Sequence, residues 1–233
     1  MAHDHDFEKQ FRLQREDYIR HLDFFTWYRH YHLIKDILRL GRRVVLEIGT
    51  GDGVLRNTLE PQVDSYVVLD INPNLYPDIV GDLRVRNAGL LDRFDGVVAA
   101  EILEHLPFAD FRACVGNLRA YLKRGGKVFL TLPNRKSNFL FVTPRQVLHV
   151  YRAPNGLLSL SEFYHRFVKR KIWIDPNHCW EIGDGQVTRQ AVESVFLEVG
   201  FMIEKFEELL YADYWVLAAG GAESDIHCHD VRG

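Results

Sequence analysis

The amino-acid sequence predicts an α/β fold in which a mostly parallel β-sheet is covered by helices on both of its faces. Two observations lead to this prediction. Short apolar runs typical of buried strands recur along the chain, the first being VVLEI at residues 44–48. Between them lie segments whose apolar residues recur at the three- and four-residue spacing of a helix. Strands that alternate with helices form parallel sheets, because each helix crosses a face of the sheet between two strands.

The first segment, residues 7–40, is predicted to be helical. Gly41 ends it, as a glycine at a helix C-cap does. The apolar residues that recur at helical spacing and form one stripe are Trp27, Tyr31, Ile34 and Leu38, with Leu33 and Ile37 beside them. Such a stripe usually packs in a core or an interface.

The remaining elements follow the same reasoning. Strands are predicted at residues 44–48, 65–70, 96–100, 127–133, 201–206 and 214–219. A helix over residues 110–123 would present Phe111, Val115, Leu118 and Leu122 on one face. A last helix begins at Thr188, a residue that caps helix N-termini well, and stops at Gly200.

Composition excludes several classes of protein. The 29 Lys and Arg against 32 Asp and Glu give a formal charge of -3, so no basic surface for nucleic acid is expected. Three scattered cysteines predict no disulfide framework, which indicates a reducing, cytoplasmic location. The polar N-terminus does not resemble a secretory signal. The sequence contains no run of about 18 apolar residues, so no membrane-spanning helix is expected.

Three glycines directly after the first predicted strand indicate a ligand site. Gly49, Gly51 and Gly53 let the backbone turn sharply and come close to a ligand, at the sheet edge where such folds bind ligands. Val54 stands where a dinucleotide fingerprint has its third glycine, and no phosphate-binding Lys-Ser/Thr follows. The acidic Glu47 beside the loop favours a ligand with an ammonium or sulfonium centre over one with phosphates.

Two further acidic residues support this site. Asp70 ends the second strand about twenty residues past the loop, where a carboxylate can accept hydrogen bonds from both ribose hydroxyls. Asp82, in the sequence GDL, could accept one from an exocyclic amine. Glu101 ends the third strand.

Taken together, VLEIGTGDG, VVLDINP, GDL, FDGVVAAEILEHLP and GGKVFLTLPN resemble the successive motifs of class I S-adenosylmethionine-dependent methyltransferases. The resemblance extends over residues 43–134 and resumes at 177–201. The EILEHLP stretch is most similar to the small-molecule branch, which includes quinone and natural-product methyltransferases. This resemblance implies a Rossmann-like, seven-stranded, mostly parallel sheet whose last strand is antiparallel.

The resemblance also implies the cofactor, S-adenosylmethionine, and the residues that bind it. Glu47 would face its methionine end, Asp70 its ribose and Asp82 its adenine amine. Ala100 and Glu101 would lie beside the sulfonium. The full implied set is Glu47, Gly49, Thr50, Gly51, Gly53, Asp70, Ile71 against the adenine face, Asp82, Leu83 through its backbone, Ala100 and Glu101.

The implied reaction is an in-line displacement, in which the acceptor attacks the methyl group and the thioether leaves. A general base is needed only if the attacking group carries a proton. His178 and His105 are the candidates, although a packing role is the more common one for such residues. Cys179 is read as structural, and no metal site is predicted, because the HCH at 227–229 lacks the partner spacing of a zinc site.

The chain is predicted to divide into five parts: an N-terminal helical cap (1–42), the cofactor-binding half (43–134), an aromatic insert (135–176), the C-terminal part of the same domain (177–220) and a tail (221–233). By the resemblance, the cap would close over the site, so Trp27, Tyr28 and Tyr31 could line it. The insert would form a lid over the acceptor; alternatively its aromatics pack against the domain or a second subunit. Those aromatics are Phe139, Phe141, Tyr151, Phe163, Tyr164, Phe167 and Trp173, and a basic run, RFVKRK, spans 166–171.

The predicted function is methyl transfer from S-adenosylmethionine to a small-molecule acceptor, by a monomer or homodimer. The alternative is a catalytically silent methyltransferase-like domain that binds a partner. A nucleotide-dependent oxidoreductase is disfavoured by Val54. Where the resemblance would place an Asn/Asp-Pro-Pro-aromatic motif for methylation of planar nitrogens, AEIL stands, so nucleic-acid bases are disfavoured as acceptors.

Overall fold

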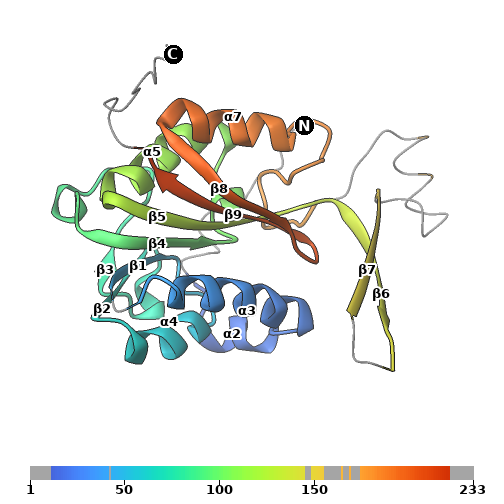
Figure 1. Cartoon of the computed structure of the whole chain (residues 1–233), viewed down its shortest axis with the longest axis horizontal. Helices are drawn as coiled ribbons and strands as arrows, with labels where there is room; N and C mark the ends of the chain where they lie inside the picture. Colours follow the sequence, from blue (N-terminus) through green and yellow to red (C-terminus); the bar gives the residue numbers. More distant parts are fainter. Residues whose placement is uncertain are drawn as a thin grey trace, which may run out of the picture.

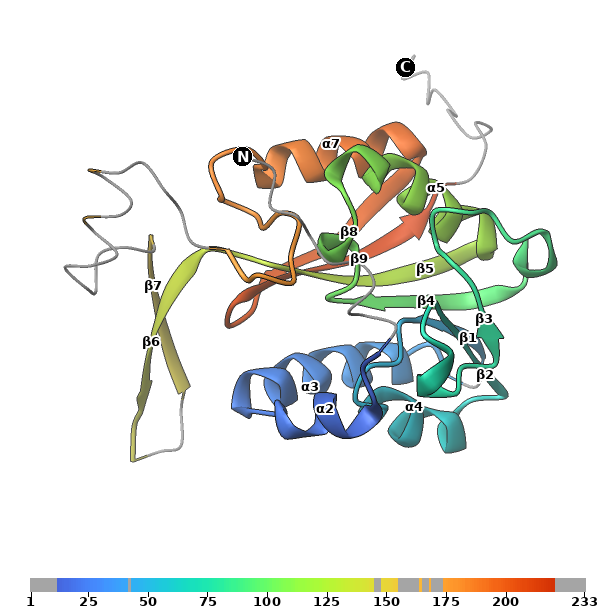
Figure 2. The same cartoon turned by 180° about the vertical axis from the view of Figure 1, so that it is seen from behind.

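A computed structural model describes residues 12–41, 43–144, 148–154, 164, 168 and 174–220 of the 233-residue chain. A central sheet is covered by helices on both faces (Figures 1 and 2). Helices α2 (Arg15–Arg20), α3 (Phe24–Leu38) and α4 (Val54–Leu59) lie on one face, and α5 (Phe111–Tyr121) and α7 (Arg189–Val199) lie on the other. The predicted α/β arrangement is confirmed.

The sheet has seven strands in the order β3-β2-β1-β4-β5-β9-β8. All neighbours pair in parallel except where β9 runs antiparallel to both β5 and β8, so the predicted antiparallel last strand is confirmed. The strands are β1 (Val44–Ile48), β2 (Ser65–Asp70), β3 (Ile79–Val80), β4 (Phe94–Ala100), β5 (Leu122–Pro133), β8 (Phe201–Glu208) and β9 (Ala212–Ala219). The two-residue β3 was not predicted.

Local sequence signals set the ends of helix α7. The hydroxyl of Thr188 accepts a hydrogen bond from the N–H of Ala191 at 3.1 Å, which satisfies a donor that the helix itself leaves open. Gly200 ends the helix in the left-handed conformation with φ 91°. Both predicted caps are confirmed.

Short 3-10 turns occur at η1 (Glu60–Gln62), η2 (Pro73–Leu75), η3 (Ala88–Leu90), η4 (Leu103–His105) and η5 (Phe108–Asp110).

The N-terminal segment differs from its prediction in extent. The described part of residues 7–40 is divided into α2 and α3, and Asp23 begins α3 by accepting the N–H of Thr26 at 2.8 Å. An aspartate at this position offers the backbone a local partner that ends one helix and starts the next.

The face of α3 that packs on the sheet was predicted only in part. Trp27 and Tyr31 are 53% and 58% exposed, and Leu38 is exposed as well, so these three residues of the predicted stripe do not pack in the core. Leu33 and Ile37, predicted beside them, are buried against the sheet, on a face that also carries His30, His32 and Asp36. Polar residues are tolerated there because each finds a charged partner from a distant part of the chain.

Two apolar clusters hold the sheet between its helix layers. Successive residues of β1 point to opposite faces, so Val45 joins the cluster under α3 while Leu46 joins the one under α5. Trp215 of β9 is completely buried in the second cluster. Full burial of each large apolar side chain contributes about 1.5–3 kcal/mol. The carboxyl edge of the parallel strands therefore rests on a rigid frame.

A two-stranded hairpin, β6 (Lys136–Val142) with β7 (Leu148–Pro154), extends away from the sheet (Figures 1 and 2). It occupies part of the 135–176 insert. Phe141 and Tyr151 stack edge to face at 5.8 Å, and both are exposed among the described residues. The lid role stays a prediction. Phe163, Phe167, Trp173 and most of the basic run at 166–171 lie outside the described residues.

Within the described ranges, no helix combines the length and the apolar character that a membrane crossing requires.

Candidate active site

The glycine loop follows β1 at the carboxyl edge of the sheet. Gly49 and Gly53 both have φ 74°, a conformation that costs glycine little. A Cβ on Gly49 would lie 2.1 Å from the Cδ1 of Ile102, and one on Gly53 would lie 3.0 Å from the Cζ of Arg15. These positions therefore require glycine, as predicted, and in this structure protein side chains lie against them.

Asp70 ties the loop to the neighbouring strand. Its carboxylate accepts the N–H of Thr50 at 2.8 Å through Oδ2 and the N–H of Asn72 at 2.8 Å through Oδ1. Burial raises the pKa of Asp70, although these backbone donors oppose the shift. Each carboxylate oxygen can accept more than one hydrogen bond. The geometry is compatible with the predicted contact to a ribose, which stays a prediction.

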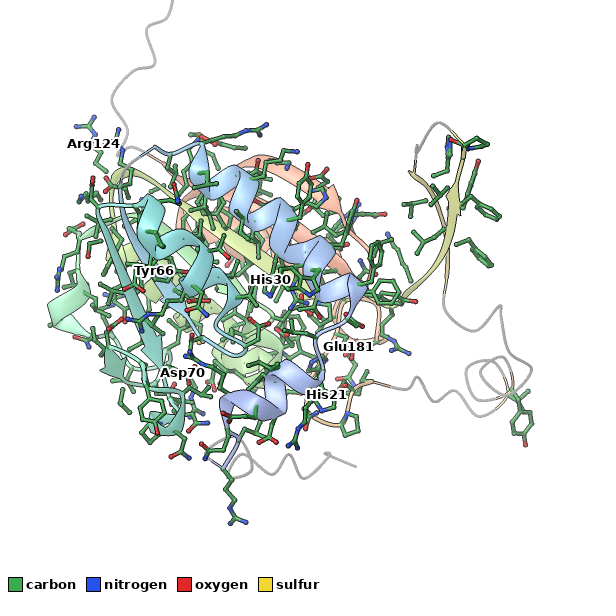
Figure 3. The ribbon with its side chains drawn as sticks, turned by 90° about the horizontal axis from the view of Figure 1, so that it is seen from below. His21, His30, Tyr66, Asp70, Arg124 and Glu181 are labelled. Carbon is green, nitrogen blue, oxygen red and sulfur yellow. The ribbon has the colours of Figure 1, made fainter. Side chains whose placement is uncertain are left out.

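Glu47 is buried inside β1 and accepts the hydroxyl hydrogen of Tyr66 at 3.1 Å; Tyr66 and Asp70 both belong to β2 (Figure 3). Burial raises the pKa of Glu47 to about 8. The carboxyl group is therefore mostly protonated at neutral pH, and the argument from the sequence that its charge attracts a cation does not hold in this structure. Its contact with the methionine end of the cofactor stays a prediction.

The predicted adenine contacts lie past β3. Burial alone would raise the pKa of Asp82, but the Arg84 guanidinium, with its Nε 2.9 Å from Oδ2, lowers it. The carbonyl of Leu83 accepts the Asn117 amide at 2.8 Å. Ile71 is half-buried, as is Ala100 at the end of β4. These contacts explain local order, and the adenine roles stay predictions.

Helix α2 lies over the glycine loop. The ring of Tyr18 is 3.6 Å from where a Cβ on Gly51 would be, and Asn72 donates its amide to the carbonyl of Leu13 at 2.9 Å. Burial, with the nearby charge of Asp70, raises the pKa of Tyr18 to about 12. This placement is compatible with the predicted helical cap, although the residues of the cap that meet the loop were not singled out from the sequence.

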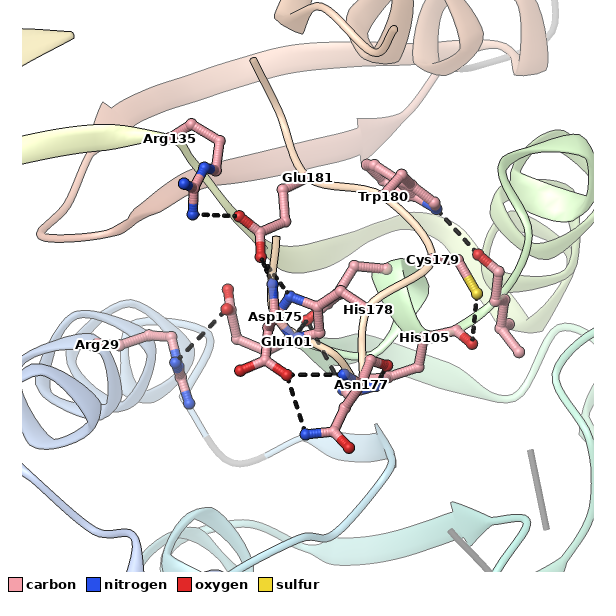
Figure 4. A network of polar contacts seen from close by, with 12 residues as sticks. Arg29, Glu101, His105, Arg135, Asp175, Asn177, His178, Cys179, Trp180 and Glu181 are labelled. Atoms are coloured by element: carbon pink, nitrogen blue, oxygen red, sulfur yellow. Dashed lines mark hydrogen bonds and ion pairs between the residues drawn. The ribbon is translucent and has the colours of Figure 1, made fainter. Parts of the chain in front are cut away.

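Glu101 connects the sheet edge to helix α3. It follows β4 with φ 55° and forms an ion pair with Arg29 at 3.8 Å (Figure 4). Burial raises the pKa of Glu101, and Arg29 opposes that shift. Thus α3 reaches the site through Arg29. Tyr28 packs against His32 at 4.7 Å, and Trp27 and Tyr31 are exposed, so their role in lining the site stays a prediction.

The fold brings the two predicted histidines together. The rings of His105, on η4, and His178 meet edge to face at 4.9 Å. The Nδ1 of His105 lies 2.8 Å from the carbonyl oxygen of Asn177. The Nδ1 of His178 lies 2.9 Å from Glu181 Oε1 (Figure 4). Both candidates therefore belong to one site, and their role as a base stays a prediction.

Glu181 was missed from the sequence. Its buried carboxylate receives His178, the N–H of Asp175 at 2.8 Å and an ion pair from Arg135 at 3.2 Å. Burial would raise the pKa of Glu181, but these partners lower it. The three-residue spacing from His178 was the available signal. Cys179 makes its contacts to backbone carbonyls of Glu104 and His105, which agrees with a structural reading.

The chain matches one protein-family model, described as a methyltransferase domain, over residues 25–205. No curated protein sequence matches it.

Several solved structures have a similar fold. The N-methyltransferase NodS from Bradyrhizobium japonicum WM9, in complex with S-adenosyl-L-homocysteine, is 15% identical with a TM-score of 0.60, over 91% of this chain and 95% of that one. The DhpI–SAH complex is 16% identical with a TM-score of 0.58, over 92% and 95%. The 1,6-didemethyltoxoflavin-N1-methyltransferase from Burkholderia thailandensis, with its substrate and S-adenosylhomocysteine bound, is 14% identical with a TM-score of 0.55, over 89% and 87%.

Proposed function

The chain belongs to the family of methyltransferase domains, and on this premise we propose that it transfers a methyl group from S-adenosylmethionine to a small-molecule acceptor. The observation that carries the proposal is the loop of Gly49 to Gly53, held against Asp70 at the carboxyl edge of the sheet. This arrangement places a loop without side chains of its own at three positions beside a carboxylate, which suits a ligand that has a ribose and no phosphate.

The sulfonium of the cofactor already activates the methyl group, so the protein contributes alignment and exclusion of water. The acceptor attacks the methyl carbon as the carbon–sulfur bond breaks. Glu101 directly follows β4, and His105 and His178 lie together. We assign Glu101 to the cofactor and the two histidines to the acceptor. We place the acceptor against these two histidines, with the 135–176 insert as its lid.

Three observations support a small-molecule acceptor in the cytoplasm. NodS and the toxoflavin enzyme, which share the fold, are named as methyltransferases of small compounds or nitrogen groups. The formal charge of -3 gives no support to a nucleic-acid partner. Cys114 and Cys179 are free thiols, which suits a reducing compartment.

Calorimetric titration with S-adenosylhomocysteine, and with NADH as a second ligand, tests the cofactor. We expect micromolar binding of the first only. Replacing Asp70 by Asn should weaken that binding about 10- to 100-fold, the scale of hydrogen bonds to charged groups. Asp95→Asn is the matched control, since Asp95 lies at the opposite end of the sheet, where it receives the N–H of Val44 at 3.0 Å. No binding by a folded wild-type protein would favour the silent, partner-binding alternative.

The acceptor class is tested with S-adenosylmethionine labelled in its methyl group and a cell extract. Label should enter the soluble small-molecule fraction. Label confined to the acid-precipitable fraction would instead identify a macromolecular acceptor and overturn that part of the proposal.

A further inference from the structure

Glu104 lies buried between the two histidines of the site. It is 0% exposed, and neither of its carboxylate oxygens accepts a hydrogen bond from another described residue. Its Oε1 is 4.0 Å from the Nε2 of His105 and 4.0 Å from the Nε2 of His178. These separations are too long for hydrogen bonds. A buried carboxylate normally has partners for its lone pairs, so this one requires an explanation.

The separations fit a shared cation. One ligand atom from each of the three residues lies within 4.8 Å of the others. Three points this close have a common centre no more than about 2.8 Å from each, and ordinary metal–ligand distances are about 2.0–2.2 Å. Side-chain shifts of less than about 1 Å would therefore complete a coordination sphere.

The Nδ1 atoms of both imidazole rings already have hydrogen-bond partners. The carbonyl oxygen of Asn177 can only accept, so the Nδ1 of His105 is the N–H that donates to it. The Nδ1 of His178 faces the Glu181 carboxylate in the same way. In a neutral ring this leaves the Nε2 lone pair pointing inward, toward Glu104. Carboxylates and carbonyls in this outer position are the usual partners of metal-binding histidines.

Backbone contacts keep the three side chains in place. The N–H of Cys179 donates to the carbonyl of Glu104 at 2.7 Å, and the indole of Trp180 donates to the carbonyl of Leu106 at 2.9 Å. These bonds join the segment of His178 to η4, which carries the other two residues. The three side chains are thus held by contacts within the described segments around η4 and His178.

We propose that Glu104, His105 and His178 bind a divalent first-row transition-metal ion such as Mn²⁺, Fe²⁺ or Zn²⁺. Two imidazoles with one carboxylate suit these ions, whereas Mg²⁺ and Ca²⁺ prefer oxygen ligands throughout. No metal site was predicted from the sequence. His178 follows His105 by more than seventy residues, so no spacing rule connects the two histidines.

The role of the ion rests on the proposed methyl transfer. Three protein ligands leave positions open for an oxygen of the acceptor. A hydroxyl bound there loses its proton to solvent more readily. The oxygen then forms the bond to the methyl carbon while the electron pair of the broken carbon–sulfur bond stays on sulfur. In this arrangement the histidines act as ligands, and no separate base is needed.

The test is a titration of the full-length, chelator-treated protein with Mn²⁺ and Co²⁺, followed by calorimetry and by the visible spectrum of bound cobalt. Glu104→Gln and His178→Gln should each weaken binding at least 100-fold. Glu181→Gln, which alters the outer partner of His178 and leaves the three proposed ligands in place, should weaken it 10- to 100-fold. His149→Gln is the matched control, because His149 is an exposed histidine on β7.

All these variants keep the four histidines of the two tails, so metal bound by the tails contributes equally to each. Wild-type protein that binds no ion more tightly than Glu104→Gln overturns the proposal. S-adenosylhomocysteine binding is measured in parallel: its loss in wild type with metal binding intact would contradict the proposed function and leave the metal site standing.

Discussion

Asp36 on α3 and Glu104 on η4 both have buried carboxyl groups, but they differ in the hydrogen-bond donors that surround them. Asp36 accepts Lys205 Nζ at 2.7 Å, Arg39 Nη1 at 2.7 Å and the Tyr214 hydroxyl at 3.0 Å. Burial would raise its pKa, but these donors lower it. Glu104 has no comparable donor, and burial raises its pKa well above the ordinary value.

This difference separates a structural use of a buried carboxylate from a functional one. A carboxylate that joins two elements of a fold needs its lone pairs filled by the same chain, because an unpaired buried charge is costly. Asp36 joins α3 to β8 and β9 in this way. Among the described residues, the side chain of Glu104 has no hydrogen-bond partner, so its oxygens are available to a group that these residues do not supply.

A third buried carboxyl group, that of Glu47, gives the largest expected effect. Its pKa is raised to about 8 in the fold, against 4.5 when exposed. The folded state therefore holds a proton that the unfolded state releases, and the stabilisation present below about pH 4.5 is lost as pH rises toward 8, by up to about 1.4 kcal/mol per unit. Glu47→Gln should remove this slope in denaturant unfolding at pH 5, 6, 7 and 8.

Glu60→Gln is the control for Glu47, since Glu60 is exposed. Equal slopes in the wild type and in both variants would show that Glu47 is solvated and ionised.

Asp36→Asn should lower the free energy of unfolding by about 3–5 kcal/mol, because it removes the charge that Lys205 and Tyr214 face. Glu204→Gln breaks an ion pair with Lys127 that is more exposed, and it should cost less than about 1 kcal/mol. Urea unfolding measures both. Similar losses in the two variants would mean that Asp36 contributes no more than a surface charge.

Glu104→Gln should change the free energy of unfolding in the opposite direction. Burial disfavours the ionised form of Glu104, which the unfolded chain adopts at neutral pH, so in metal-free protein the amide removes this cost and stability should rise by about 1–2 kcal/mol. The same urea experiment measures it. A loss of stability would place Glu104 with Asp36, as a carboxylate whose partners the fold already provides.

Arg39→Gln gives the smallest expected effect. Arg39 is the most exposed of the donors to Asp36, and it lies three residues along the same helix. Its loss should cost about 0.3–0.5 kcal/mol. A cost near that of Asp36→Asn would show that Asp36 depends on all three donors together.

The same contrast explains what could be predicted from the sequence. Strand and helix positions follow from local patterns, and so do the caps at Thr188 and Gly200, because their causes lie within a few residues. The positions of the site residues after β1, β2 and β4 follow from the topology of parallel sheets. These parts of the fold and of the candidate site were accessible without a structure.

The errors concern residues whose partners are distant along the chain. The buried face of α3 carries Asp36 because Lys205 pairs with it from 169 positions away, and no periodicity reports such a partner. Arg29 and Glu181 were missed for the same reason, since each acquires its role from a residue on another element.

The hydrogen bond from the N–H of Cys179 to the carbonyl of Glu104 also bears on how this enzyme could be redesigned. Because main-chain atoms and Trp180 join the two halves of the site, the side chains at positions 104, 105 and 178 could be exchanged while their Cα atoms stay in place. Acceptor chemistry could then change by a few substitutions on a constant scaffold, without rebuilding the loops that carry them.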